Sequence, residues 1–198
     1  MLTRKNIEKV AITDLDVVNP YFRSRDVKHL LNEAGIRLIA PAGKLSTSDL
    51  PIVSGEIYGV ISNPEYHLII DVGGDQDGAT ALGQYYNDLK NTEHEMAFVI
   101  NANRPQVSTA TDVIAAIKRI ESVSRLKVTG LINNTHLGVG TTLSDITKGT
   151  QLTGEVAEKL KIPFLFTTID EKFKEITSNI DSKERVLYIN RFMRLPWE

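Results

Sequence analysis

The sequence predicts an α/β domain built on a mostly parallel sheet with helices on both faces. Short apolar runs alternate with longer amphipathic segments along the whole chain, and this rhythm is typical of strand–helix–strand units with right-handed crossovers. The apolar runs are continuous rather than alternating, as expected for strands buried on both faces. No linker, internal repeat or low-complexity segment divides the 198 residues, so we expect one domain over residues 1–198.

The apolar runs are the expected strands. They cover residues 10–13, 36–41, 67–71, 96–101, 128–133, 163–166 and 186–189. The expected helices fill the intervals and cover residues 25–33, 79–89, 109–123 and 156–160, where apolar residues recur at helical spacing. Ser24 is the expected N-cap of the first helix and Gly35 its end. Residues 135–150 are rich in Gly and Thr and are expected to form a long connection, whose length favours a binding role.

The composition is that of an ordinary soluble globular protein, with 24% charged and 41% hydrophobic residues. The 23 basic and 25 acidic side chains nearly balance, which gives no indication of a nucleic-acid or anionic-membrane surface. The absence of cysteine excludes disulfides, thiolate metal sites and thiol catalysis. The sequence has neither an apolar run of membrane-spanning length nor a signal peptide, so we expect a cytoplasmic protein.

Polar side chains follow several of the expected strands directly. Because ligands of parallel sheets bind beyond the carboxyl ends of the strands, we expect Asp14, Asp71, Asn101 and Asn133 to cluster at one edge of the sheet. Acidic and amide side chains at such an edge are suited to handling Mg²⁺, phosphates and a base.

The segment Asp71-Val72-Gly73-Gly74 follows an apolar run and is a candidate metal and phosphate site. A carboxylate at Asp71 can hold Mg²⁺ through water, and Gly74 lets a backbone N–H approach a terminal phosphate. The alternative is a tight turn that needs glycine. Asp75 and Asp77 are expected to cap the next helix.

Asp14 and Asp16 end the first strand and are the candidate catalytic carboxylates. One of them would order an attacking water or the metal. Residues at alternate positions of an extended chain point to opposite sides, so we expect only one to face the site and the other to be a turn residue.

Asn133 and Asn134 close a buried strand. An amide has both a donor and an acceptor and can pair with the edge of a purine, although Asn also simply tolerates turn geometry. The four histidines share no metal-ligand spacing. Gly43-Lys44 is followed by Leu45 rather than Ser or Thr and is not a phosphate-binding loop.

Together these residues resemble the MinD/ParA group of P-loop ATPases, the deviant-Walker family. Residues 14–22 resemble the Asp-x-Asp-x-x-Asn-Pro-Tyr-Phe stretch of a set of ATP-binding proteins within that group. Residues 71–75 lie where the second acidic motif of the family falls, and residues 133–135 match its strand-end amides. The resemblance covers residues 10–168 and implies ATP and Mg²⁺ as ligands. It implies that Asp14 or Asp16 orders water, Asp71 serves the metal, and Asn133 or Asn134 meets the base.

One departure from the family is large. The family places a strand, a Gly-rich loop with a phosphate-binding Lys, and a helix before the Asp-x-Asp strand, whereas only nine residues precede Val10 here. We interpret the sequence as a family member shortened at its N-terminus. Since the missing loop supplies the anion site, we expect no measurable ATP hydrolysis. The missing strand would leave a gap in the sheet, which either closes within the chain or is filled by another copy, and we expect a homodimer.

Two other classes of protein remain open. Residues 10–18 also fit the start of a haloacid-dehalogenase-type phosphohydrolase, with Asp14 as nucleophile and Asp16 as acid, although the acidic pair Asp75 and Asp77 comes too early for that family. The third hypothesis is a non-enzymatic interaction module that uses an inherited NTPase scaffold.

Overall fold

The computed structural model describes residues 9–15, 27–39, 55–177 and 185–192. Contacts between residues divide the chain into two compact units. The first comprises residues 1–94, 123–126 and 192–198, and the second comprises residues 95–122 and 127–191. Among the described segments, no helix has the length and apolar character needed to cross a membrane.

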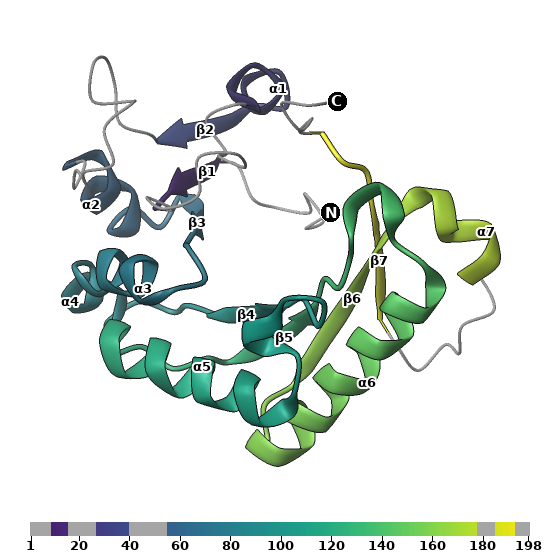
Figure 1. Cartoon of the computed structure of the whole chain (residues 1–198). Helices are drawn as coiled ribbons and strands as arrows, with labels where there is room; N and C mark the ends of the chain where they lie inside the picture. The colour runs from purple at the N-terminus through teal and green to yellow at the C-terminus, as the bar shows by residue number, and fades with distance from the viewer. Residues whose placement is uncertain (1–8, 16–26, 40–54, 178–184, 193–198) are drawn as a thin grey trace. The chain divides into compact units, whose positions relative to one another are not determined.

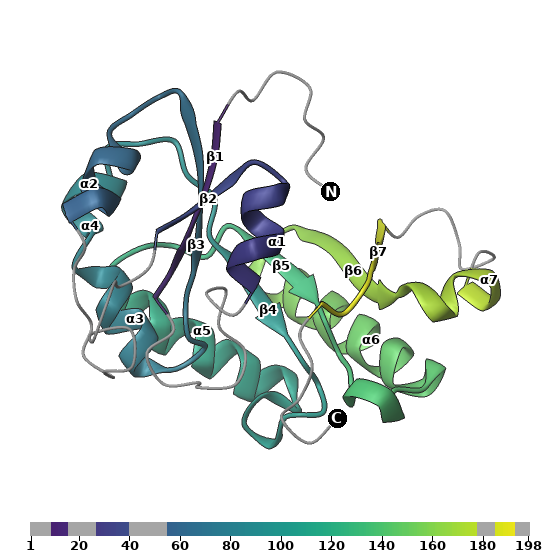
Figure 2. The ribbon, with the colours of Figure 1, turned by 90° about the horizontal axis from the view of Figure 1, so that it is seen from above.

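The first unit contains a three-stranded parallel sheet of order β2-β1-β3 (Figure 1). Its strands are β1 (Lys9–Asp14), β2 (Ile36–Ile39) and β3 (Tyr66–Asp71). Its helices are α1 (Lys28–Glu33), α2 (Gly55–Ile61), α3 (Gln76–Gly83) and α4 (Tyr86–Leu89). Figure 2 shows the three strands running side by side. In the β1–β3 register, Asp14 lies opposite Asp71, so the two strands end at the same level.

A small core lies beneath the helices of the first unit. Ile57 and Val60 of α2 are buried, as are Ala79 and Leu82 of α3. Tyr85 is only 1% exposed, and its ring lies 5.1 Å from that of Tyr58. Burial of this tyrosine brings the loop after α3 and the helix α2 together.

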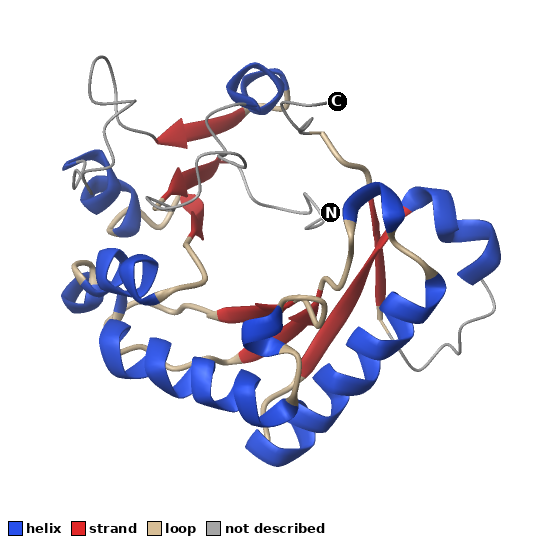
Figure 3. Ribbon diagram, viewed as in Figure 1, coloured by secondary structure: helices blue, strands red, loops and turns tan. Residues whose placement is uncertain are grey.

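The second unit contains a four-stranded parallel sheet of order β4-β5-β6-β7. Its strands are β4 (Ala97–Ile100), β5 (Gly130–Asn133), β6 (Phe164–Asp170) and β7 (Val186–Ile189), and its helices are α5 (Ala110–Ser124), α6 (Leu143–Leu160) and α7 (Lys174–Thr177). The long helices α5 and α6 cover one face of this sheet (Figure 3). Val113 and Ile117 of α5, Val156 of α6, and Ile100 and Leu131 of the sheet form the core between them.

All seven expected strands are present, and the expected α/β class with parallel sheets flanked by helices is confirmed. The helices differ from the expectation more than the strands do. The expected helix over residues 79–89 is two helices, α3 and α4, because Arg125 Nη2 donates to the Gly83 carbonyl (2.6 Å) and Tyr85 turns into the core. Helix α2 has no counterpart among the expected helices. The expected N-cap Ser24 lies outside the described residues.

The expectation of a long connection over residues 135–150 is wrong. Helix α6 begins at Leu143, and Thr142 is its N-cap. Thr142 Oγ1 accepts from the Asp145 N–H (3.3 Å), while the Asp145 carboxylate accepts from the Thr142 N–H (2.8 Å). This reciprocal capping box starts the helix well before the apolar positions on which the prediction relied.

Two strands are less covered than continuous apolar runs indicate. Exposure alternates along β3 and β4, and Ile69 keeps 36% and Val99 keeps 54% of its surface exposed. Each of these strands lies at the end of its sheet, with a hydrogen-bonded neighbour strand on one side. Among the described residues, these two end strands therefore carry exposed apolar side chains, as does the end strand β7, where Ile189 is 39% exposed.

Candidate functional site

The carboxyl ends of β1 and β3 bring two predicted site residues together in the first unit. Asp14 and Asp71 are register partners, and the Leu15 N–H donates to the Asp71 carbonyl (2.7 Å) just beyond them. Asp14 is 6% exposed, whereas Asp71 is exposed. One buried and one exposed carboxylate thus end neighbouring parallel strands.

The loop after β3 is held tightly by the helix that follows it. Asp75 accepts from the Gly78 N–H (2.8 Å) and caps α3, which confirms its expected capping role. A Cβ atom on Gly78 would lie 2.2 Å from the Gly73 carbonyl oxygen, so the first turn of α3 packs directly on the loop backbone. Gly74 is exposed, with open space around its Cα, and its backbone is accessible to a ligand.

Asp14 and Asp71 are the two predicted site carboxylates of this unit that the structure describes. No group of three or more His, Cys, Asp or Glu side chains in the described segments could hold a metal ion by itself. A hard cation such as Mg²⁺ keeps several waters and takes one or two carboxylates together with substrate phosphates, which suits such a pair. The second candidate catalytic carboxylate, Asp16, lies outside the described residues.

In the second unit, Asn133 lies in the protein interior. Its side chain is 0% exposed. Its Oδ1 accepts from the Thr135 N–H (3.0 Å) and the Thr135 hydroxyl (2.7 Å). Its Nδ2 donates to the carbonyl oxygen of Ile146 (3.4 Å) and to the hydroxyls of Thr150 (3.2 Å) and Thr167 (3.5 Å). Asn133 therefore joins β5 to α6 and β6.

Asn134 is half-buried and has hydrogen-bonding capacity left. Its Oδ1 accepts from the Thr168 hydroxyl (2.6 Å), which orients the amide. Within the described part of the chain, Nδ2 has no hydrogen-bond acceptor. Of the two predicted base-contacting amides, Asn134 is thus the one that has a donor available.

Asn101 ties the loop after β4 to the loop after β5. Its Nδ2 donates to the His136 carbonyl (3.1 Å), and its Oδ1 accepts from the His136 N–H (3.4 Å). The Ala102 N–H donates to Thr135 Oγ1 (3.0 Å) beside it. These bonds place the polar ends of β4 and β5 next to each other. The expectation that Asn101 and Asn133 share an edge with Asp14 and Asp71 stays a prediction.

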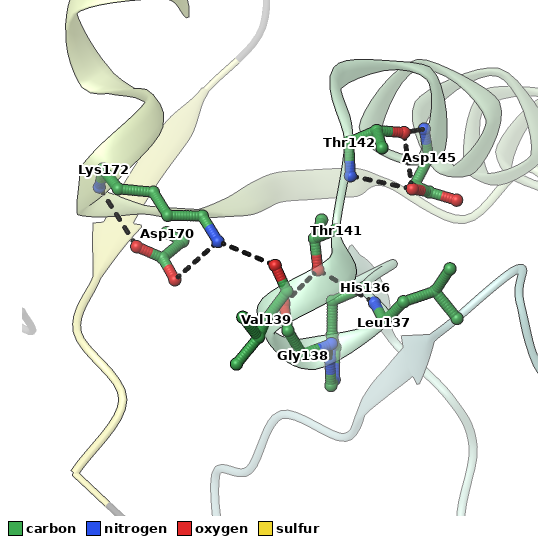
Figure 4. A network of polar contacts seen from close by, with 9 residues as sticks. All are labelled: His136, Leu137, Gly138, Val139, Thr141, Thr142, Asp145, Asp170 and Lys172. Atoms are coloured by element: carbon green, nitrogen blue, oxygen red, sulfur yellow. Dashed lines mark hydrogen bonds and ion pairs between the residues drawn. The ribbon is translucent and has the colours of Figure 1, made fainter.

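A glycine-containing turn, Gly138–Gly140, follows His136 and is drawn in Figure 4. Thr141 Oγ1 donates to the Gly138 carbonyl (2.7 Å) and accepts from the Leu137 N–H (2.9 Å). From the end of β6, Lys172 Nζ donates to the Val139 carbonyl (3.4 Å) and lies 4.0 Å from Asp170 Oδ2. The loops after β5 and β6 are therefore joined.

Two titratable groups beside this turn have shifted pKa values. Hydrogen bonds from Thr142, and a further one from Asn103, lower the pKa of the Asp145 carboxyl and keep it ionised as the cap of α6. Partial burial lowers the pKa of His136, and the charges of Arg104 and Arg191 lower it further. The sequence reasoning missed this group of residues. The signal available for it was the Thr142–Asp145 capping-box spacing.

The fold defines a class: an α/β protein with parallel sheets flanked by helices. The structure is similar to that of FtsY from Mycoplasma mycoides, with a TM-score of 0.52 and 20% sequence identity over 82% of this chain. This chain spans about half of FtsY, since the match covers 51% of that protein. At this identity the likeness concerns the fold alone.

A second solved structure, the enoyl-acyl carrier protein reductase of Bacillus cereus with NADP+ and indole naphthyridinone, has a TM-score of 0.30 and 13% identity. That match covers 89% of this chain and 77% of the reductase, and its TM-score is too low to support a comparison. No family model and no curated protein sequence matches the chain.

Proposed function

We propose that this chain is a nucleotide-binding domain of the MinD/ParA type that takes ATP together with Mg²⁺. The observation that carries the proposal is the register pairing of Asp14 with Asp71 at the ends of adjacent parallel strands. Ligands of open α/β sheets bind at such strand ends, and paired carboxylates there suit a hydrated Mg²⁺. The likeness of the fold to FtsY supports the same class.

Each predicted residue receives a role under this proposal. Asp71, which is exposed, serves the metal through water. Asp14 or Asp16 orders the attacking water. Gly74, whose backbone is accessible, approaches the terminal phosphate. Asn134 meets the base through its available Nδ2. Asn133, whose own amide is hydrogen-bonded within the protein, holds the end of β5 and thereby the neighbouring Asn134 in place.

We also propose that this chain alone does not measurably hydrolyse ATP. The sequence holds no Gly-x-x-x-x-Gly-Lys-Ser/Thr loop, and phosphoryl transfer depends on electrostatic stabilisation of the phosphates. Losing two or three charge-assisted hydrogen bonds of about 1.5–3 kcal/mol each weakens binding by about a hundredfold or more. A phosphate loop contributed from outside these 198 residues would complete the site.

Calorimetric titration of MgATP tests the proposal. We expect no measurable binding to the chain itself and measurable binding to a version extended at its N-terminus by a strand and a Gly-Lys-Ser/Thr loop. In the extended protein, Asp71→Asn should weaken the Mg²⁺-dependent part of binding. Asp88→Asn, which removes a carboxylate from α4, is the matched control and should leave binding unchanged.

Several outcomes would contradict the proposal. Micromolar MgATP binding to the unextended chain, abolished by Asp71→Ala, would show that the site works without the loop. Mg²⁺-dependent hydrolysis of a generic phosphate ester, lost in Asp14→Asn, would indicate the haloacid-dehalogenase-type alternative instead. Partner binding that survives removal of Asp16, Asp71 and Asn134, with no nucleotide binding in the extended protein, would favour the interaction module.

We also propose that copies of the chain associate as a homodimer. Strands β3 and β4 end their sheets and carry the exposed apolar residues Ile69 and Val99. Unpaired backbone groups and apolar side chains at a sheet edge favour pairing with another chain.

A further inference from the structure

Cationic side chains gather at the Gly138–Gly140 turn of the second unit. Arg104 precedes the 3-10 turn Pro105–Val107 that follows β4, and Arg191 follows β7. Arg191 Nη1 lies 3.8 Å from the position that a Cβ atom on Gly138 would take. The Arg104 N–H donates to the Asn101 carbonyl (3.0 Å), and the Asn101 side chain bonds the backbone of His136. The charges of both arginines also lower the pKa of the His136 imidazole. Three nitrogen-bearing side chains from three strand ends therefore lie in one region.

The hydrogen bonds of His136 determine which of its ring nitrogens is available. Nδ1 lies 3.1 Å from the Gly138 nitrogen and accepts its N–H. The neutral ring therefore carries its proton on Nε2. The backbone of His136 is held on both sides by Asn101, which fixes the start of the turn. Nε2–H is a donor on an anchored residue, and it has no acceptor among the described side chains and backbone groups.

The acidic groups near the turn are already engaged. Asp145 accepts from Thr142 and Asn103 at the start of α6, and Asp170 accepts from the Lys172 N–H (3.0 Å) and lies beside its ammonium. Arg104 is exposed and forms no ion pair within the part of the chain that the structure describes. The guanidinium of Arg104 is therefore available to an anionic ligand at this place.

We propose that Arg104, His136 and Arg191, together with the Gly138–Gly140 turn, bind a phosphate group. A guanidinium presents several donors in a planar fork that matches phosphate oxygens, and the Nε2–H of His136 adds a neutral donor. Gly138 has φ +61° and no side chain, so the ligand can approach the backbone of the turn closely. This inference does not depend on the proposed nucleotide function, because the site contains none of Asp14, Asp71 or Asn134.

An NMR titration of the whole chain with inorganic phosphate tests the site, with sodium chloride at matched ionic strength as reference. Phosphate should shift the amide signals of residues 136–140 and the Nε2 signal of His136, and chloride should not. Arg104→Gln should weaken the apparent affinity by about tenfold or more, the loss of one charge-assisted hydrogen bond. Arg119→Gln, which changes an exposed arginine on α5, is the matched control and should change nothing.

A lipid headgroup could supply the same phosphate chemistry, and a second arm distinguishes the two sources. Vesicles of phosphatidylcholine with and without phosphatidic acid are sedimented with the wild-type chain and both variants. Binding that requires phosphatidic acid and Arg104, without a response to inorganic phosphate, assigns the site to a headgroup. If neither probe binds, or if Arg104→Gln and Arg119→Gln reduce binding equally, no specific phosphate site exists at the turn.

Discussion

Two adjacent amides, Asn133 and Asn134, show how far single residues can be interpreted from sequence. Both follow an apolar run and both were candidates for contacting a base. The structure shows that the two amides differ in hydrogen bonding. The amide of Asn133 is hydrogen-bonded to Thr135, Thr150 and Thr167, whereas Asn134 has a donor available. The threonines at 150 and 167 come from α6 and β6, so no local pattern around β5 could have shown which amide was saturated.

This separation predicts different costs for two alanine substitutions. Asn133→Ala leaves the buried Thr135 N–H without its acceptor and should lower the free energy of unfolding by about 2–4 kcal/mol. Asn134→Ala, at a half-buried position, should cost about 1 kcal/mol or less. Urea denaturation of both variants measures the difference. Equal costs would mean that the buried amide network does not stabilise the second unit.

The buried phenol of Tyr85 should make the stability of the protein depend on pH in the alkaline range. Burial, and then the charge of Tyr58, raise the pKa of Tyr85 from 10.0 to about 12. The unfolded chain therefore loses this proton first, so the stability that the neutral phenol contributes is complete below pH 10 and is lost between pH 10 and about 12. The loss should reach about 2–3 kcal/mol. In Tyr85→Phe this part of the loss should be absent.

The same variant has a built-in control at neutral pH. The Tyr85 hydroxyl is buried and has no hydrogen-bond partner among the described residues, so Tyr85→Phe should leave stability near pH 7 unchanged or raise it by up to about 1 kcal/mol. Thermal unfolding across this pH range measures both effects. A large loss at neutral pH would show that the hydroxyl is bonded in solution.

At the scale of elements, strands were easier to predict than helices. Each strand contains a short apolar run, and several runs end at a charged or polar residue, such as Asp71 at the end of β3. Helix α6 was harder, because its first turns carry Ser, Thr, Gly and Lys rather than an apolar stripe. The capping box at Thr142 and Asp145 determines where α6 starts. Gly149 determines how closely α6 approaches β5, because Asn133 and Thr135 pack against it.

Two glycines of α6 give a matched test of this packing. A Cβ atom at Gly149 would lie 2.1 Å from Thr135 Oγ1 and 2.3 Å from Asn133 Oδ1, whereas one at Gly154 would meet nothing within 4 Å. Gly149→Ala should therefore destabilise the protein by about 1–3 kcal/mol. Gly154→Ala should stabilise it by up to about 1 kcal/mol through helix propensity. The midpoints of thermal unfolding compare the two, and a stabilising Gly149→Ala would contradict the close approach of α6 to β5.

At the scale of the whole molecule, the rhythm of strands and helices was enough to predict the fold class. It was not enough to predict where the sheets end. Continuous apolar runs at β3 and β4 indicated strands with both faces covered, yet Ile69 and Val99 are exposed, and each strand lies at the end of its sheet. Strand neighbours depend on pairing between distant segments, which a local apolar pattern does not encode. Which strands end the sheets is therefore known from the structure and not from the sequence. The property that these sheet edges affect most is self-association.

Val99→Lys tests whether the edge strand β4 mediates self-association. Residues 97–100 contain neither a charged residue nor a proline, the usual devices that keep an edge strand from pairing, and Val99 is 54% exposed. We expect sedimentation velocity to show a dimer for the wild-type chain. Lysine at position 99 should shift the population to monomer, because a buried unpaired ammonium is costly at an interface. Ile176→Lys, at another exposed apolar position on α7, is the control and should stay dimeric. A wild-type chain that sediments only as monomer would show that the edge is satisfied within one copy, and equal loss of dimer in both variants would place the interface elsewhere than β4.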